Sequence, residues 1–525
     1  LKGTRMNSHG FELVTERRLH EVGGTARLWK HGVTGAQLLS VSNADENKCF
    51  GVSFRTPPTD STGVAHILEH SVLCGSEKYP VKEPFVELLK GSLQTFLNAF
   101  TFPDKTCYPV ASANLQDFYN LIDVYIDAVF HPRISEDIFR QEGWHVEAGD
   151  TKGPWTYKGV VYNEMKGVFS APESVLDSYI HTAMFPDTCY GVESGGDPED
   201  IVKLTYEDYL AFYHKYYHPS NSYIYLYGDM DMAEKLKWLD EEYLGKYDRK
   251  EIDSEIQIQK KFKEPIEREI FYSVSESESL DHATYLSINT QAGNELSPKE
   301  YVAFQILEYV LLDAPGAPLK KALLDAGIGD DIMGGYEYGI LQPYFSVIAK
   351  NAEREQKDEF VKIVKAELKK LADGGIDKKC LKAGINNYEF QYREADYGST
   401  PKGLMYGLQC LDSWLYGGDP MMHLEYEDTF AALKKGADSG YFEGLIRTYL
   451  LDNPYEAVVI ASPKKNLTAR IEEQTAKKLK EYKDSLSKEE IETLVRQTKE
   501  LKEYQDTPSP KEDLEKRRSE GNRRS

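Results

Sequence analysis

The stretch His66-Ile67-Leu68-Glu69-His70 places two histidines four residues apart, with a glutamate directly before the second one. At about 100° per residue, a helix brings positions i and i+4 to one face, so both imidazoles can reach one metal ion. Glu69 lies next to the position of that metal ion, where it can act as a base without being a ligand. This is H-x-x-E-H, the inverted form of the zincin motif. We therefore predict a zinc-binding helix over residues 62–73.

A third ligand is needed, because a catalytic zinc ion usually takes three protein ligands and one water. Glu164 lies early in a second predicted helix, residues 160–169, and Glu147 follows a Gly-Trp-His-Val stretch. A carboxylate on a rigid helix facing the first suits a preorganised site, so we prefer Glu164 and keep Glu147 as the alternative. His145 and His131 are lesser candidates that fit better as ordinary surface or core residues.

Composition limits the class of protein. The chain has 525 residues, 41% of them hydrophobic, so two or more ordinary globular domains are expected. The net charge of −23 argues against nucleic acid, which requires a basic footprint. We see no run of spanning length, no secretory signal and no paired cysteine motif among the six cysteines. We therefore expect no membrane contact and free thiols in the cytoplasm, or in an organellar matrix if a transit peptide was removed.

The spacing of apolar residues predicts mixed α and β structure. We predict strands within residues 20–60, helices over 85–97 and 115–130, a hairpin over 98–112 and a buried strand over 223–228. The charged stretch 246–265 is the best internal boundary.

An internal repeat follows this boundary. Gln305-Ile306-Leu307-Glu308-Tyr309 copies the first motif 239 residues later, keeping the Ile-Leu-Glu centre and losing both histidines. Each motif follows a strand-like segment, residues 49–55 and 285–291. We therefore predict two domains of one architecture, the first with a metal and the second without.

The last part of the chain differs in composition. Residues 466–505 are rich in Lys, Glu and Leu, and Ser487-Lys488-Glu489-Glu490 has the form of a capping box. We predict two charged helices that end at the Pro-Ser-Pro break of residues 508–510 and act as a connector.

Long segments of the chain resemble the inverzincin peptidases of the pitrilysin and insulin-degrading-enzyme group, above all the presequence protease and falcilysin branch. The resemblance covers essentially the whole chain. It is carried by HILEHSVLCGSEKYPVKEPF, LNAFTFPDKTCYPVAS, GVVYNEMKGVFS, YGVESGGDP and YYHPSNSYIYLYGD.

The resemblance implies roles for individual residues. It assigns one Zn²⁺ to His66, His70 and Glu164, with Glu69 as the general base. It assigns the substrate-binding edge strand, to which the peptide adds backbone to backbone, to Asn98, Ala99 and Phe100. One position departs from the pattern of pitrilysin-like members, since Tyr157 stands where they often have a second glutamate.

The resemblance also implies a fold and a function. The expected fold class is α+β, with two homologous α/β-roll repeats followed by a helical hinge. The expected domains are residues 1–255 (catalytic), 262–465 (degenerate) and 466–525 (connector). The expected function is a zinc endopeptidase for short unstructured peptides, in which this chain is the N-terminal half and the C-terminal half of the same enzyme is its partner. The alternatives are a non-catalytic scaffold and a half-enzyme that needs a partner half.

Overall fold

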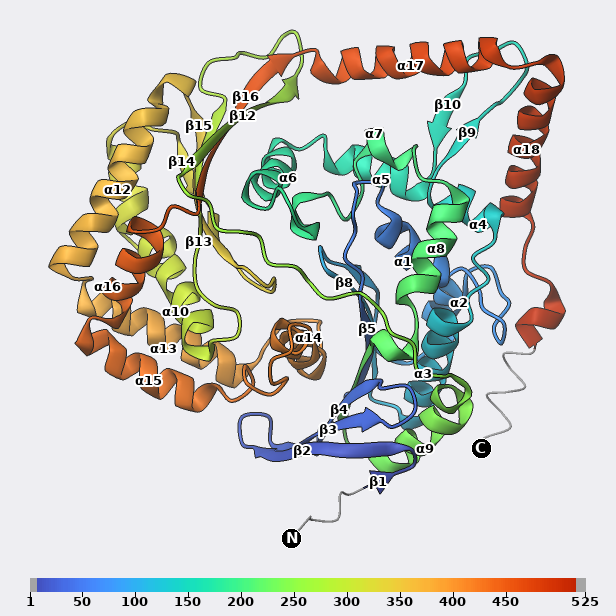
Figure 1. Cartoon of the computed structure of the whole chain (residues 1–525), viewed down its shortest axis with the longest axis horizontal. Helices are drawn as coiled ribbons and strands as arrows, with labels where there is room; N and C mark the ends of the chain where they lie inside the picture. The colour runs from blue at the N-terminus through green and yellow to red at the C-terminus, as the bar shows by residue number, and fades with distance from the viewer. Residues whose placement is uncertain (1–6, 516–525) are drawn as a thin grey trace.

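Two β-sheets with helices packed on them form the computed structural model, which describes residues 7–515 (Figure 1). The first sheet has nine strands in the order β1-β2-β3-β4-β11-β5-β8-β6, and β7 also pairs with β8. Their bounds are β1 (Asn7–Ser8), β2 (Phe11–Leu19), β3 (Gly24–His31), β4 (Gln37–Ser42), β5 (Lys48–Arg55), β6 (Gln94–Leu97), β7 (Phe100–Thr101), β8 (Lys105–Ser112) and β11 (Ser222–Gly228). Only β4 and β11 are parallel neighbours among these strands.

The second sheet repeats the core of the first. Its order is β12-β16-β13-β15-β14, with β12 and β16 parallel and the other neighbours antiparallel, which matches β4-β11-β5-β8-β6 strand for strand. The bounds are β12 (Ile266–Val274), β13 (Thr284–Gln291), β14 (Asp331–Glu337), β15 (Tyr344–Ala352) and β16 (Glu456–Lys465). The predicted repeat and the α+β fold class are therefore confirmed.

Helices account for most of the remaining chain. In the first half they are α1 (Val64–Val72), α2 (Pro84–Gly91), α3 (Leu115–Phe130), α4 (Glu136–Glu142), α5 (Val160–Val168), α6 (Pro172–Met184), α7 (Pro198–Ile201), α8 (Tyr206–Tyr216) and α9 (Met232–Glu242). In the second they are α10 (Pro298–Glu308), α11 (Pro318–Asp325), α12 (Lys357–Gly374), α13 (Lys378–Glu394), α14 (Lys402–Trp414), α15 (Tyr426–Ser439) and α16 (Tyr441–Leu445). The predicted helices at α1, α3 and α5 are confirmed.

Each half contributes one helix to the sheet of the other. Helix α6 packs on β12, β13 and β16, and α14 packs on β5, β8 and β11. At α14 the helix and the sheet approach very closely, since a Cβ on Gly403 would lie 2.2 Å from the ring of Tyr227 and one on Gly407 would lie 2.5 Å from Tyr225. This exchange joins the two repeats into one packed unit. The division of the chain near residues 255 and 465 stays a prediction.

The predicted helix over residues 85–97 is wrong in its second half. Helix α2 ends at Gly91, and Gln94–Leu97 forms strand β6, which pairs with β8. Glycine weakens a helix because it gains the most backbone freedom on unfolding, and the ladder with β8 then satisfies the backbone groups that a longer helix would have paired internally. The predicted hairpin is present as β7 and β8.

Two long helices bridge the repeats on one side of the molecule (Figure 1). Helix α17 (Leu467–Ser485) continues from β16 and touches β12, and α18 (Lys488–Asp506) packs on α4 and β9 (His145–Glu147). Ser487 and Glu490 form the predicted capping box at the start of α18. The predicted pair of charged helices is therefore confirmed, and its second helix returns to the first repeat.

Two further expectations can be compared with the structure. All six cysteines are free thiols, as predicted. Among residues 7–515, no helix combines the length and the apolar character needed to cross a membrane.

Candidate metal centre and peptide-binding edge

Helix α1 presents its polar residues on one face because its apolar pair is buried. Ile67 and Leu68 are fully buried in the core of the first sheet. The helix begins after Gly63, whose φ of 70° is left-handed. A Cβ on Gly63 would lie 2.8 Å from the Gly195 carbonyl oxygen and 2.8 Å from Gly196 Cα. Glycine at this position therefore allows the 193–196 loop to lie directly against the start of α1.

Glu164, on helix α5, meets both histidines of α1. Its Oε1 lies 3.6 Å from His66 Nε2, and its Oε2 lies 3.6 Å from His70 Nε2. The ligand atoms of the three residues all lie within 4.8 Å of one another, and within residues 7–515 no other group of three or more His, Cys, Asp and Glu has such an arrangement. Zinc bonds of about 2.1 Å at tetrahedral angles separate ligand atoms by about 3.4 Å, so this donor set fits a zinc ion.

Each imidazole is held through its second nitrogen. His66 Nδ1 lies 2.9 Å from the Gly195 carbonyl oxygen, to which it donates a hydrogen bond. The lone pair of Nε2 is then free to bind a metal ion. His70 Nδ1 lies 3.3 Å from Oε2 of Glu142, a buried residue at the end of α4. Such partners fix the tautomer and the ring orientation of ligating histidines. Neither partner was predicted.

The charges around His70 favour the positively charged form of its imidazole. Burial lowers the pKa of the His70 imidazole, but the Glu142 hydrogen bond and the charges of Glu69, Glu142 and Glu164 outweigh it and raise the pKa. Burial raises the pKa of Glu142, but its hydrogen bonds with His70 and Gln141 outweigh that effect and lower the pKa. Three carboxylates thus surround two histidines, which is the electrostatic setting of a metal site.

The predicted base is tied to the edge of the first sheet. Glu69 Oε2 accepts a hydrogen bond of 2.6 Å from the Thr101 hydroxyl on strand β7. Glu69 contributes no atom to the ligand group of three. It therefore lies next to the candidate metal position with an orientation set by the edge hairpin. Thr101 stands in the resemblance segment LNAFTFPDKTCYPVAS, but its contact with Glu69 gave no sequence signal.

The alternative third ligands lie elsewhere. Glu147, in β9, lies 3.6 Å from the ammonium of Lys158. His145 Nδ1 is 2.8 Å from the Arg140 carbonyl oxygen. His131 stacks on Tyr243 and Tyr247. Of the four candidates, the structure brings only Glu164 to the histidine pair.

Tyr157, the departure from the pitrilysin-like pattern, lies in β10 (Thr156–Lys158). Its ring packs edge-on against Trp144 and Tyr162. Tyr162 is on α5, two residues before Glu164. Tyr157 therefore supports the helix that carries Glu164 by ring packing, where a glutamate would act by its charge.

The residues expected to bind the peptide lie at the edge of the first sheet. Strand β6 is the last in the sheet order, and Asn98 and Ala99 join it to β7. The Asn98 carbonyl already accepts a hydrogen bond of 3.1 Å from Tyr125, and Ala99 is buried. Phe100 stands between Phe96 and Phe102, with ring centroids 6.2 Å and 5.9 Å away. The edge position agrees with strand addition, whereas Ala99 and the Asn98 carbonyl serve the fold.

Three family models match the chain. They are the insulinase model of peptidase family M16 over residues 53–150, the inactive domain of the same family over 203–388, and a domain associated with subfamily C of these peptidases over 462–516. Protein HypA of Clostridium perfringens is 49% identical over 508 residues, which cover 96% of this chain and 52% of the relative. Presequence protease 1 of Arabidopsis thaliana is 44% identical over 515 residues, covering 96% of this chain and 48% of the relative.

Solved structures show the same fold. A protease from Helicobacter pylori has a TM-score of 0.63 at 20% identity, covering 82% of this chain and 98% of the other. Pitrilysin has a TM-score of 0.59 at 17% identity, covering 87% of this chain and 47% of pitrilysin. The chain belongs to the insulinase-type peptidases of family M16, a family of metallopeptidases, and it is close to the presequence proteases. It spans about half the length of the curated relatives that it matches.

Proposed function

We propose that this chain is the zinc-binding part of an endopeptidase that hydrolyses short unstructured peptides. The observation that carries the proposal is the convergence of His66, His70 and Glu164, with Glu69 beside them and outside the ligand set. The names of the presequence proteases among the relatives support the substrate class.

The chemistry divides between the metal and the chain. Zinc bound by the two histidines and Glu164 would supply a Lewis acid that polarises the peptide carbonyl and activates water. Glu69 accepts the proton of the attacking water and passes it to the leaving amine, so no covalent intermediate is needed. Thr101 orients the carboxylate of Glu69, while Gly195 and Glu142 hold the two imidazoles.

The sheet edge selects the conformation of the substrate. A peptide that pairs with the backbone beside Asn98–Phe100 must be extended, and it is recognised by shape more than by sequence. A stable globular domain cannot offer a free strand, so it should resist cleavage. We place the protein in a reducing compartment because all six of its thiols are free.

The additional length of the relatives bears on activity. We propose that the relatives' additional length corresponds to a C-terminal half, and that this half closes the site and adds groups that stabilise the developing charge on the substrate carbonyl. Such electrostatic groups are often worth about 10²–10³ in rate each. The chain alone should therefore bind zinc normally and cleave peptides slowly.

Zinc titration tests the ligand set directly. Glu164→Gln should lose most of the zinc affinity, because an amide oxygen is a poorer zinc ligand than a carboxylate. Glu147→Gln is the matched control and should keep it. Full zinc binding by Glu164→Gln, with loss in Glu147→Gln, would reverse the assignment. Cleavage of an unstructured peptide by the zinc-loaded chain with an added C-terminal half, abolished by a chelator, tests the function itself.

A further inference from the structure

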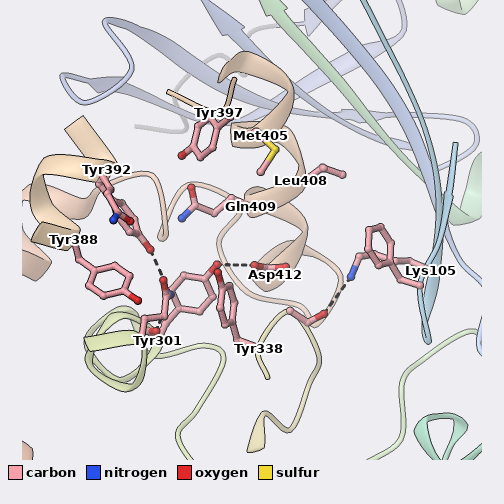
Figure 2. A pocket seen from close by; sticks show the side chains of 14 residues that line it. Lys105, Tyr301, Tyr338, Tyr388, Tyr392, Tyr397, Met405, Leu408, Gln409 and Asp412 are labelled. Atoms are coloured by element: carbon pink, nitrogen blue, oxygen red, sulfur yellow. Dashed lines mark hydrogen bonds between the residues drawn. The ribbon is translucent and has the colours of Figure 1, made fainter. Parts of the chain in front are cut away.

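A cavity of about 380 Å³ lies between the two repeats (Figure 2). Phe102, in the turn after β7, and Lys105, the first residue of β8, form one side of it. Helices α10, α13 and α14 and the residues after β14 form the rest. Five tyrosine side chains line it: Tyr301, Tyr338, Tyr388, Tyr392 and Tyr397.

This cavity contains a residue of the degenerate motif. Gln305, which stands where His66 stands in the first repeat, lines the cavity and donates hydrogen bonds to the Tyr301 carbonyl (3.0 Å) and the Tyr392 hydroxyl (3.4 Å). Glu308, the counterpart of Glu69, accepts a hydrogen bond of 2.8 Å from the backbone of Tyr336. The second repeat has thus lost its metal ligands, and a tyrosine-walled cavity lies beside the first residue of the motif.

One carboxylate in the wall has no cation in direct contact with it, although the charge of Lys105 acts on it through space. Asp412, on α14, is 9% exposed and accepts a hydrogen bond of 2.6 Å from the Tyr301 hydroxyl. It makes no salt bridge within the described part of the chain. Figure 2 shows Tyr301 and Tyr338 beside Asp412, with Lys105 on the opposite side. A buried carboxylate without a direct ion pair is costly even when a lysine acts on it through space, so a cationic ligand beside Asp412 would stabilise it.

The nearest lysine is already occupied. Lys105 Nζ lies 3.4 Å from an oxygen of Asp104, donates a hydrogen bond of 3.2 Å to the Gly339 carbonyl, and sits 4.8 Å from the centroid of the Phe102 ring. Glu295, outside the cavity lining, is fully buried, and its Oε2 has no hydrogen-bond partner within residues 7–515. Burial raises the pKa of Glu295 well above its usual range, and the pKa of Asp412 to about 6. Among the residues that line the cavity, Asp412 is the one carboxylate, and Lys105 already has Asp104 and the Gly339 carbonyl as partners.

We propose that this cavity binds the side chain of an arginine or lysine of the peptide. Tyrosine faces attract a cation within about 6 Å, and Asp412 supplies the counter-charge. The cavity also continues the proposed peptide path, because Phe102 lies two residues beyond Phe100, about 7 Å along an extended strand. The proposal rests on the proposed function in one respect, namely that the peptide lies along β6 and β7.

Peptide binding to the intact chain tests this proposal. The chain carries Glu69→Gln to prevent hydrolysis, and the probes are fluorescent ten-residue peptides of Ser, Thr and Asn with one arginine placed at each position in turn. Citrulline, which keeps the shape of arginine without its charge, replaces it in the control set. Anisotropy titrations should find one or two adjacent positions at which arginine binds about 10-fold tighter than citrulline.

Variants locate the effect in the cavity. Asp412→Asn, which keeps the hydrogen-bond acceptor for Tyr301, and Tyr338→Leu should each abolish most of the preference. Tyr482→Leu, on α17, is the matched control, since Tyr482 is 45% exposed and Tyr338 is 44% exposed. Equal binding of arginine and citrulline at all positions would overturn the proposal, as would a preference that survives both cavity variants.

The outcome can be separated from that of the proposed function. A chain that cleaves peptides but shows no arginine preference would refute the cavity assignment alone. A chain that shows the preference and loses it in Asp412→Asn, yet neither binds zinc nor cleaves, would refute the peptidase assignment alone.

Discussion

Glu142 provides the sharpest test of how the candidate metal site is supported, because it lies outside the ligand set. Its Oε2 is 3.3 Å from His70 Nδ1, and its side chain is 11% exposed. Two opposite unit charges at that distance interact by about 5 kcal/mol at an effective dielectric constant of 20. Only a fraction of the zinc charge is felt through the imidazole ring. We therefore expect a loss of about 1.4–2.7 kcal/mol in zinc binding, which corresponds to the 10–100-fold range known for such partners.

Two substitutions separate charge from orientation. Glu142→Gln keeps an acceptor for His70 and removes the charge, so zinc affinity should fall about 10-fold. Glu142→Ala removes both, and affinity should fall about 100-fold. The assay is competition with a zinc chelator of known affinity at neutral pH, and Glu147→Gln serves as the control. Wild-type affinity in both Glu142 variants would refute the role that we assign to this carboxylate.

Three further substitutions test other parts of the molecule. Glu69→Gln should bind zinc with near-normal affinity yet lower peptide turnover at least about 100-fold in the assembled enzyme, and near-normal turnover would sink the role of Glu69 as base. Thr101→Val should lower turnover and leave zinc affinity unchanged, because it removes the hydroxyl that orients Glu69; equal losses in both would point to a folding defect. Burial raises the pKa of Asp412 from 3.8 to about 6, so its contribution to stability is fully present below about pH 4 and is lost as the pH rises through 6. Relative to the wild type, Asp412→Asn should therefore gain up to about 3 kcal/mol in unfolding free energy between pH 4 and 7.5, and parallel pH profiles in chemical denaturation would contradict this.

Some features of this protein follow from short stretches of sequence. His66 and His70 share a helix face because of the i, i+4 spacing, and Ser487 caps α18 because its partner Glu490 is three residues away. These signals are local, so they hold wherever the helix is placed. The repeat of the Ile-Leu-Glu centre likewise predicted two sheets of one topology, because a motif in the same strand–helix context packs in the same way.

Other features could not be predicted from such stretches. The segment Gln94–Leu97 has a spacing compatible with a helix and becomes a strand only because β8 lies beside it. The exchange of α6 and α14 between the sheets depends on a close approach at Gly403 and Gly407 that neither segment reveals alone.

The candidate site shows the same division. Sequence predicted the histidine pair, the proposed base and, with the resemblance, the proposed third ligand. Only the tertiary structure decided what holds them, since Gly195 is 129 residues from His66 and Thr101 is 32 residues from Glu69. A hydrogen bond acts over about 3 Å in space, and it does not depend on how far apart its partners lie along the chain. Groups such as Glu142 therefore carry no local signal that separates them from the other acidic residues, and the packing of α1 against α4 and the glycine loop selects them.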